Sequence, residues 1–176
     1  MTHHFHKIIS WLTAMVLMGI SLLSPILSTS PALAAIRQLE EATGQIVYQS
    51  RQAISDQHGD RWQVIAFNRL RPDGSSHVYL RLVGFPGSVT IDRTQPLQLI
   101  SSMQQIFTVQ DASSHIFTNE SAPEPHIGQY DLQAIASQLP TAIPMQLVLP
   151  TVGQEAIVLA LSPGLIQEWQ TVATHN

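Results

Sequence analysis

The sequence contains no cysteine, and only 11% of its 176 residues are charged. Without cysteine the protein can form no disulfide bond, and it offers neither a thiol nucleophile nor a thiolate ligand for a metal ion. A membrane anchor attached through a cysteine is excluded for the same reason. Since charged residues usually make up about 25% of a soluble domain, we expect a surface whose polarity comes mainly from glutamine, serine and threonine.

Basic side chains are scarce, and lysine is almost absent. Lys7 is the only lysine, the other basic residues are arginines, and the formal net charge is −4. Proteins that bind nucleic acid present a basic face, and proteins held on anionic lipid carry a polybasic stretch. The sequence has neither feature, so we expect no nucleic-acid partner and no electrostatic attachment of the mature chain to a membrane surface.

Residues 1–34 have the layout of a secretory signal peptide. A lysine precedes a mostly apolar run over residues 8–27, and residues 32–34 then form an A-x-A cleavage site. The run is also close to the ~20 residues of a membrane-spanning helix, so an uncleaved anchor is the alternative. The A-x-A site favours cleavage after Ala34. We therefore expect residues 35–176 to form a single exported domain that is not inserted in a membrane.

Residues 44–84 predict an antiparallel meander. Segments rich in β-branched and aromatic residues cover residues 44–55, 61–70 and 77–84. A Pro-Asp-Gly turn separates the second segment from the third, because proline presets the backbone angle and glycine adopts a positive φ. We therefore expect three consecutive strands joined by short turns.

The register across the second turn decides which side chains share a face. We place Leu70 opposite His77. Phe67 then lies on the same face as Leu80, and Arg81 lies on the opposite face. A shift by one residue would exchange the faces. Both faces carry large apolar side chains, so each must be covered or the sheet must curl toward a barrel.

Residues 81–99, RLVGFPGSVTIDRTQPLQL, hold two glycines, two prolines and three charged residues. Glycine and proline favour tight connections between strands. We therefore predict a hairpin connection over residues 84–87, with its phenylalanine packed against the end of the sheet. The alternative is functional, since arginine suits carboxylate binding. In that interpretation a small anion is bound at one end of the sheet by Arg81, Asp92 and Arg93.

The C-terminal half predicts further short strands and two short helices. The strand patterns cover residues 96–101, 106–111, 143–150 and 155–162. Asp131 can cap a helix that Pro140 ends. Ser162 is the N-cap candidate of a final helix, with Pro163 at its first position. We therefore expect an α+β fold: a mainly antiparallel β-sheet that can curl strongly, with two short helices and the C-terminal one packed on the sheet.

The richest polar cluster is the loop over residues 115–126. It holds two histidines and two carboxylates, which are His115, Glu120, Glu124 and His126. Imidazole and carboxylate both bind zinc, so these residues are a candidate metal site. Their spacing matches no known metal-binding motif, and the plainer interpretation is an acidic surface loop. We predict no other cofactor.

A hydrolase interpretation rests on Asp111, Ser113, Ser114 and His115, with His115 as the base. The chain contains no G-x-S-x-G nucleophile elbow and no S-x-x-K motif. Catalytic triads are assembled in space, so closeness in the sequence carries little weight. Six arginines also lie in or beside the predicted strands, where we expect local ion pairs with nearby aspartates.

Four segments of the sequence resemble one known family. They are GQIVYQSRQAISDQHGDRWQVIAF, RLVGFPGSVTIDRTQPL, IGQYDLQAIASQLP and IQEWQTVA. Together they are similar to exported cyanobacterial proteins grouped as domain of unknown function 3122. The resemblance covers nearly the whole mature chain, and it carries no catalytic residues. It implies an exported protein in the periplasm or the thylakoid lumen, where small accessory proteins of the photosynthetic complexes occur.

The favoured function is therefore a non-enzymatic accessory or assembly role on a photosynthetic or other membrane complex. One alternative is a binding module for a small anion that uses Arg81 and Arg93. The other is a hydrolase that uses His115. The sequence specifies neither the partner nor the oligomeric state.

Overall fold

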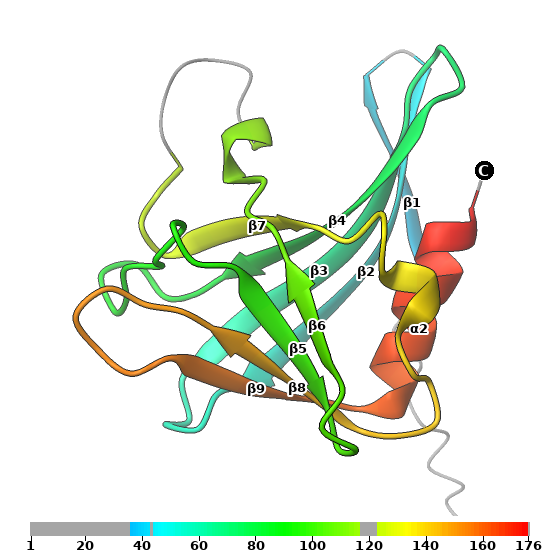
Figure 1. The fold of residues 1–176 in the computed structure, drawn as a ribbon. Coiled ribbons are helices and arrows are strands. Elements are labelled where there is room, and N and C mark those ends of the chain that lie inside the picture. Colours follow the sequence, from blue (N-terminus) through cyan, green and yellow to red (C-terminus); the bar gives the residue numbers. More distant parts are fainter. Residues whose placement is uncertain (1–35, 43, 117–122, 176) are drawn as a thin grey trace, which may run out of the picture. The chain divides into compact units, whose positions relative to one another are not determined.

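The computed structural model describes residues 36–42, 44–116 and 123–175, so the predicted signal peptide lies outside the described residues. The described residues form nine β-strands, one α-helix and two short 3₁₀ turns (Figure 1). The strands are β1 (Arg37–Ala42), β2 (Gln45–Ser55), β3 (Arg61–Leu70), β4 (Ser76–Val83), β5 (Leu97–Ser101), β6 (Ile106–Val109), β7 (Ile127–Asp131), β8 (Met145–Leu149) and β9 (Ile157–Leu161). The helical elements are η2 (Ser113–His115), η3 (Ala136–Gln138) and α2 (Pro163–Thr174).

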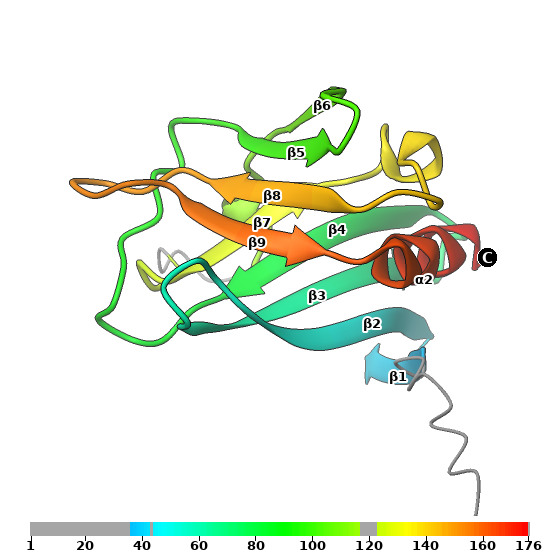
Figure 2. The same ribbon diagram turned by 90° about the horizontal axis from the view of Figure 1, so that it is seen from below.

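The strands form two open antiparallel sheets. The larger sheet has the strand order β1-β2-β3-β4-β7, and the smaller sheet has the order β6-β5-β8-β9. Every strand pairing within the described residues is antiparallel. Figure 2 shows the sheets as separate layers, with α2 at one end of the space between them. The prediction of a mainly antiparallel fold is confirmed, as two sheets rather than a closed barrel.

The hydrophobic core lies between the two sheets and under α2. Leucines from both sheets, such as Leu80 in β4 and Leu147 in β8, belong to one buried cluster. Trp169 belongs to the same cluster, because α2 packs on β2 and β3. Ser162 starts this helix as predicted, since its Oγ accepts a hydrogen bond from the Leu165 N–H at 3.2 Å. The bond satisfies one of the backbone donors that a helix start leaves free.

The turn between β3 and β4 sets a register that differs from the predicted one. Leu70 lies opposite Ser76, so the prediction is wrong by one residue. A shift of one residue exchanges the faces of a strand. Phe67 and Arg81 therefore share the outer face of the larger sheet. This register keeps Arg81 off the face that buries Trp62, and burying an unpaired charge in that core would be costly.

The helix predicted after Asp131 is only the 3₁₀ turn η3, so the described residues contain one α-helix instead of two. Asp131 ends β7 and lies opposite Tyr79, and the next N–H, that of Leu132, donates to the Val78 carbonyl at 3.0 Å. Sheet pairing therefore uses the residues that would start the helix. Pro140 stops any extension, and a helix of the few remaining residues would be marginal.

The connection over residues 84–87 joins the two sheets and is not a hairpin. It leads from β4 toward β5, and the Gly84 N–H donates to the His126 carbonyl at 2.9 Å. Phe85 is 72% exposed, so the prediction that it packs against the sheet is wrong. The end of the sheet is already filled by Trp62, whose ring lies 2.9 Å from the position of a Cβ on Gly84.

The sequence pattern predicts neither β1 nor β7, which are the two edges of the larger sheet. The β1 sequence, RQLEEA, is rich in residues that favour helices, and the β7 sequence, IGQYD, contains glycine and glutamine. Both segments become strands by pairing with β2 and β4, respectively. Their structure therefore depends on tertiary partners more than on local preference.

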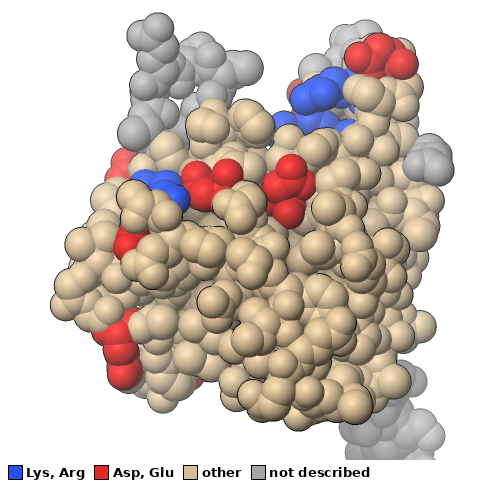
Figure 3. All heavy atoms as spheres, viewed as in Figure 1, with Lys and Arg blue, Asp and Glu red and all other residues tan. Residues whose placement is uncertain are grey.

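Among the described residues, no charged side chain lies on the outer face of the smaller sheet. Its outward residues are Gln98, Ile100, Ile106, Thr108, Gln146, Val148, Val158 and Ala160. Figure 3 shows this side of the protein as an area almost free of Lys, Arg, Asp and Glu. Within the described part of the chain, no helix has the length and apolar character needed to cross a bilayer.

Candidate functional site

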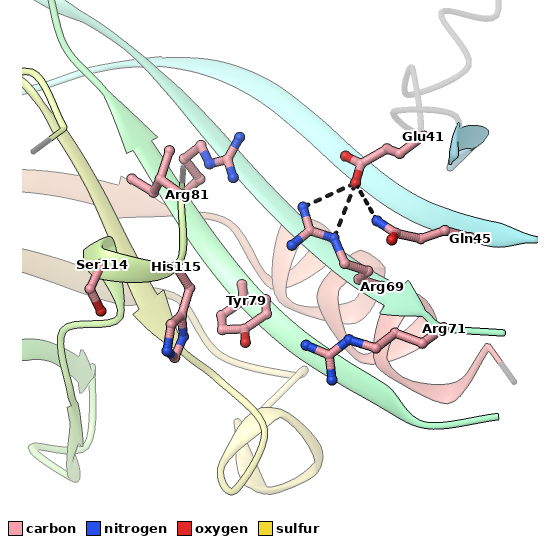
Figure 4. A pocket seen from close by; sticks show the side chains of 9 residues that line it. Glu41, Gln45, Arg69, Arg71, Tyr79, Arg81, Ser114 and His115 are labelled. Atoms are coloured by element: carbon pink, nitrogen blue, oxygen red, sulfur yellow. Dashed lines mark hydrogen bonds and ion pairs between the residues drawn. The ribbon is translucent and has the colours of Figure 1, made fainter. Parts of the chain in front are cut away.

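A cleft lies on the outer face of the larger sheet, over β3 and β4. It encloses about 680 Å³, a size typical of small-molecule sites. Side chains reach it from β1, β2, the β3–β4 hairpin and η2 (Figure 4). The lining residues are Glu41, Gln45, Arg69, Arg71, Tyr79, Arg81, Ser114, His115 and Ile116.

The register of β3 and β4 brings aromatic and basic side chains together on this face. Phe67 lies opposite Tyr79, and Ile65 lies opposite Arg81. The Phe67 and Tyr79 rings, 5.5 Å apart, belong to a small buried cluster with Val47 that is separate from the main core. This apolar cluster forms the floor beneath the arginines.

Arg81 is a half-buried cation with a neutral hydrogen-bond partner. Its Nε and Nη2 donate to the Gln129 side-chain oxygen at 3.2 and 2.7 Å. Its guanidinium carbon lies 5.0 Å from the centre of the Phe67 ring. Burial lowers the pKa of Arg81 and the positive charge of Arg69 lowers it further, whereas the negative charge of Glu41 partly offsets this lowering. No carboxylate of the described residues bonds to this guanidinium, which stays charged at neutral pH.

Arg69 differs from Arg81 because it has a carboxylate partner. Its Nη2 and Nε lie 3.0 and 3.1 Å from Glu41 Oε2. Gln45 holds the same carboxylate in place, because its Nε2 donates to Glu41 Oε2 at 2.9 Å. Arg69 also lies over the Phe67 ring, 5.6 Å from its centre. Glu41 therefore neutralises Arg69 within the cleft.

Arg71 adds a third guanidinium at the end of the cleft nearest the β3–β4 turn. Its side chain is exposed and makes no hydrogen bond or ion pair within the described residues. The cleft thus holds three arginines and one carboxylate. Within the part of the chain that the structure describes, Arg71 and Arg81 form no direct ion pair, although Asp73 acts on Arg71 and Glu41 acts on Arg81 through longer-range attraction.

Aromatic rings complete the wall of the cleft. The His115 ring meets Tyr79 edge to face, with ring centres 6.2 Å apart. His77 lies against the other side of Tyr79 at 4.5 Å. The His115 imidazole makes no hydrogen bond or ion pair within residues 36–42, 44–116 and 123–175. The cleft therefore combines cationic and flat aromatic surfaces.

The predicted anion-binding residues are only partly brought together. Arg81 lies in the cleft, whereas Arg93 Nη2 donates to the backbone carbonyls of Glu124 and Ile127, each at 2.7 Å. Asp92 accepts hydrogen bonds from the hydroxyl and backbone N–H of Thr94 and from a side-chain amide, and these bonds lower its pKa. No hydrogen bond or ion pair in the described residues joins Arg81 to Asp92 or Arg93.

The predicted metal ligands occupy different environments. His115 is exposed and lines the cleft, Glu124 is exposed, and His126 is buried with its backbone carbonyl bonded to Gly84. Glu120 lies outside the described residues. Within the described ranges, no three histidine or acidic residues are close enough to hold a metal ion.

The residues of the hydrolase interpretation are partly assembled. Ser113 Oγ donates to Asp111 Oδ1 at 2.5 Å and accepts a hydrogen bond from the Gln129 N–H at 3.0 Å. Ser113 is buried, so these bonds attach η2 to β7. His115 bonds to neither residue within the described chain, and the arrangement holds a loop in place.

Sequence reasoning missed Glu41, Gln45 and Tyr79, and it considered Arg69 and Arg71 only as strand arginines. A signal was present in the pairs Phe67/Arg69 and Tyr79/Arg81, which repeat an aromatic and a basic residue two positions apart. Residues two apart on a strand share a face. Only the register shows that the two pairs share the same face.

Comparisons with known proteins place the chain in a family without an assigned function. A family model described as "Protein of unknown function (DUF3122)" matches residues 34–172. Searches of curated proteins and of solved structures found no match. The family match covers every strand of both sheets and nearly all of α2. The chain therefore belongs to the DUF3122 family of proteins of unknown function.

Proposed function

We propose that this protein binds a small organic anion in the cleft and acts as a binding module rather than as an enzyme. The observation that carries the proposal is Arg81, a half-buried guanidinium whose hydrogen-bond partner is the neutral side chain of Gln129. A partly desolvated charge without a directly bonded counterion is costly. A bound anion would supply that counterion.

The preference for binding over catalysis rests on the surroundings of His115. A general base needs a hydrogen bond to the group it activates, directly or through one water. Within the described residues the imidazole contacts the edge of the Tyr79 ring and bonds to no hydroxyl. The arginines, in contrast, suit carboxylate and phosphate recognition. The anion site predicted from the sequence contained Arg81, Asp92 and Arg93. The proposed site keeps Arg81 and contains Arg69 and Arg71 instead of the other two residues.

Isothermal titration calorimetry with benzoate and inorganic phosphate tests the proposal on the purified protein. We expect at least one of these anions to bind and to raise the melting temperature. The variant Arg81→Gln should lose the binding, whereas Arg61→Gln should keep it, because Arg61 is an exposed strand arginine outside the cleft. The variant Arg71→Gln should also weaken binding, and its exposed side chain makes no bond whose loss would unfold the protein.

Two results would contradict the proposal. One is the absence of heat and of thermal stabilisation with every anion. The other is equal affinity in the parent protein, Arg71→Gln and Arg61→Gln, which would indicate nonspecific ion binding. Arg81→Gln removes internal contacts and could lower stability, whereas Arg71→Gln removes no side-chain bond of the described residues. Weaker binding in both variants therefore indicates a lost binding site and not a destabilised fold.

The second proposal is docking on a membrane complex as an accessory protein. The observation that favours it is the uncharged outer face of the smaller sheet (Figure 3). A face without charge is complementary to an uncharged surface of a partner, because no ionic group has to be desolvated. Export through a signal peptide cleaved after Ala34, and a site in the periplasm or thylakoid lumen, belong to this proposal.

Purification of the tagged protein from gently solubilised membranes tests docking. We expect co-purification of subunits of one membrane complex, and loss of those subunits with Ile106→Asp, since Ile106 is 58% exposed on the edge strand β6. The matched control is Ser55→Asp, at an exposed position of β2 in the larger sheet. Recovery of the protein alone, or recovery that Ile106→Asp leaves unchanged, contradicts docking through this face.

A further inference from the structure

The distribution of charge in the cleft restricts the kind of anion that it can bind. Glu41 already occupies Arg69, through contacts of 3.0 and 3.1 Å, and is itself held by Gln45. A ligand therefore meets the remaining two guanidinium groups, those of Arg71 and Arg81, which form no direct ion pair in the described residues and are only acted on at longer range by Asp73 and Glu41, respectively. An anion with a single charge would leave one of them without a direct ion pair.

The two remaining cations lie at opposite ends of the cleft. Arg81 is opposite Ile65, whereas Arg71 follows the end of β3 at Leu70. At ~3.3 Å per residue, the six positions from Ile65 to Arg71 correspond to about 20 Å along the strand. Figure 4 shows Arg69 and Tyr79 in the interval between Arg71 and Arg81. One compact acid group cannot reach both ends, although the long side chains shorten the span.

Aromatic rings lie between and beside the two cations. The Tyr79 and His115 rings line the cleft, 6.2 Å apart, and Phe67 lies 5.5 Å from Tyr79 in the floor. Aromatic rings gain additional attraction from a flat unsaturated partner, by stacking or by edge contacts. A planar guanidinium can also stack on such a partner.

We infer that the ligand of the cleft is a dianionic aromatic acid, with two acid groups at opposite ends of a flat body. This inference rests on the proposed anion-binding function and goes beyond it by assigning the number of charges, their spacing and the shape of the body. One acid group pairs with Arg81 and the other with Arg71. The ring lies over Tyr79, beside the ion pair of Arg69 and Glu41.

Four simple acids separate these features in a calorimetric titration of the purified protein. Terephthalate carries two carboxylates at opposite ends of a ring, phthalate carries them side by side, and benzoate carries one. Cyclohexane-1,4-dicarboxylate has the opposite placement on a saturated, puckered ring. We expect terephthalate to bind about tenfold more tightly than benzoate or phthalate, which cannot make the second charge-assisted pair. It should also bind more tightly than the cyclohexane acid, which makes both pairs but has no aromatic ring to contact Tyr79.

The variant Arg71→Gln provides the decisive control. It should remove the advantage of terephthalate over benzoate by weakening terephthalate much more than benzoate, because benzoate pairs with Arg81 and meets Arg71 only as a nearby charge. Arg61→Gln should change neither affinity, since Arg61 is exposed and outside the cleft. This pattern would not follow from a general loss of structure, which would weaken both acids equally.

The outcomes also distinguish the inference from the proposed function. If benzoate or phthalate binds as tightly as terephthalate, anion binding stands and the spacing of two acids is wrong. If the cyclohexane acid binds equally well, the aromatic part of the inference is wrong. If Arg71→Gln weakens benzoate and terephthalate by the same factor, the separate role of Arg71 is wrong. If none of the four binds, the proposed function fails together with the inference.

Discussion

Ser50 and Glu168, which are 118 positions apart in the chain, meet in a buried hydrogen bond of 2.6 Å between the Ser50 hydroxyl and Glu168 Oε2. The bond joins β2 to α2 in the region where the helix packs on the larger sheet. Both residues are buried, with exposed fractions of 0% for Ser50 and 7% for Glu168. A polar contact in this place orients the helix on the sheet, which apolar packing alone does not do.

Removing the Ser50 hydroxyl should weaken the attachment of α2. We expect Ser50→Ala to lower the free energy of unfolding by about 1.5–3 kcal/mol, the range for a buried hydrogen bond to a charged group. Urea denaturation followed by circular dichroism measures the change. Ser55→Ala is the control, because Ser55 is exposed on the same strand. Equal stability of the two variants would show that the contact does not stabilise the fold.

Gly84 is required by the close approach of Trp62. A Cβ at this position would lie 2.9 Å from the Trp62 ring, and Trp62 is buried. We expect Gly84→Ala to reduce the free energy of unfolding by about 1–3 kcal/mol through overpacking. Gly164→Ala is the matched control in α2, where the nearest atom lies 4.0 Å away. It should stabilise the protein by roughly 0.5–1 kcal/mol, and a loss in both variants would contradict the steric explanation.

Asp56 makes stability depend on pH in the acid range. Desolvation raises the pKa of Asp56, but hydrogen bonds from Trp62 Nε1 at 3.0 Å and from the N–H groups of His58 and Asp60 together lower it below 3.8. A depressed pKa means that the folded state binds the proton less tightly than the unfolded state does. The ionised Asp56 side chain therefore stabilises the fold fully at pH values above its pKa in the unfolded state. This stabilisation is lost as the pH falls through its pKa in the folded state.

We therefore expect the parent protein to lose part of its free energy of unfolding as the pH falls from about 5 to below 3.8. In Asp56→Asn this component of the loss should be absent, and stability at pH 7 should be lower. Chemical denaturation of both proteins at a series of pH values measures it. Asp60→Asn serves as the comparison because Asp60 is exposed. Parallel pH curves for the parent and Asp56→Asn would contradict this role.

Trp169 contributes through its volume rather than through its indole N–H. The side chain is fully buried, and Nε1 has no hydrogen-bond partner in the described residues. Trp169→Ala should cost about 3–5 kcal/mol. Trp169→Phe should cost less than Trp169→Ala, because it keeps an aromatic ring, leaves a smaller cavity and removes an unpaired donor. Thermal or urea unfolding measures both, and similar losses would indicate an essential indole contact.

Arg93 is expected to hold a loop, in contrast to Arg81. Its Nη2 donates to the carbonyls of Glu124 and Ile127 at 2.7 Å. Arg93→Ala should accelerate hydrogen exchange of the Ile91 and Ile127 amides, which bond to carbonyls of the same loop. Benzoate affinity should stay unchanged in this variant. A lower benzoate affinity of Arg93→Ala would show that Arg93 takes part in anion binding, as the sequence predicts.

Local signals in the sequence correctly predict the helix and strands whose conformation depends mainly on their own residues. The Ser162–Pro163 start of α2 and the strands over residues 45–55 and 61–70 follow from capping, proline geometry and β-branched composition. The same signals fail where a partner decides the outcome. The helix expected after Asp131 is only the 3₁₀ turn η3, because Asp131, its expected cap, ends β7 and pairs with β4.

The cleft is the part of the protein that the sequence does not predict. Its residues come from β1, β2, the β3–β4 hairpin and η2, so their closeness depends on contacts between segments that are distant in the chain. Alternation along β3 and β4 divides the side chains into two sets, but it does not say which set of β3 joins which set of β4. A shift of one residue at Leu70 decides that Phe67 and Arg81 share a face.

The sequence by itself determined a cysteine-free, sparsely charged and mainly β chain that ends in a capped helix, because composition, capping and β-preference act over a few neighbouring residues. Only the tertiary structure decided the β3–β4 register, the edge strands β1 and β7, and the arginine cleft. These features depend on contacts between residues distant in the chain. The burial of one face of each sheet selects among those contacts, and no local preference can do so.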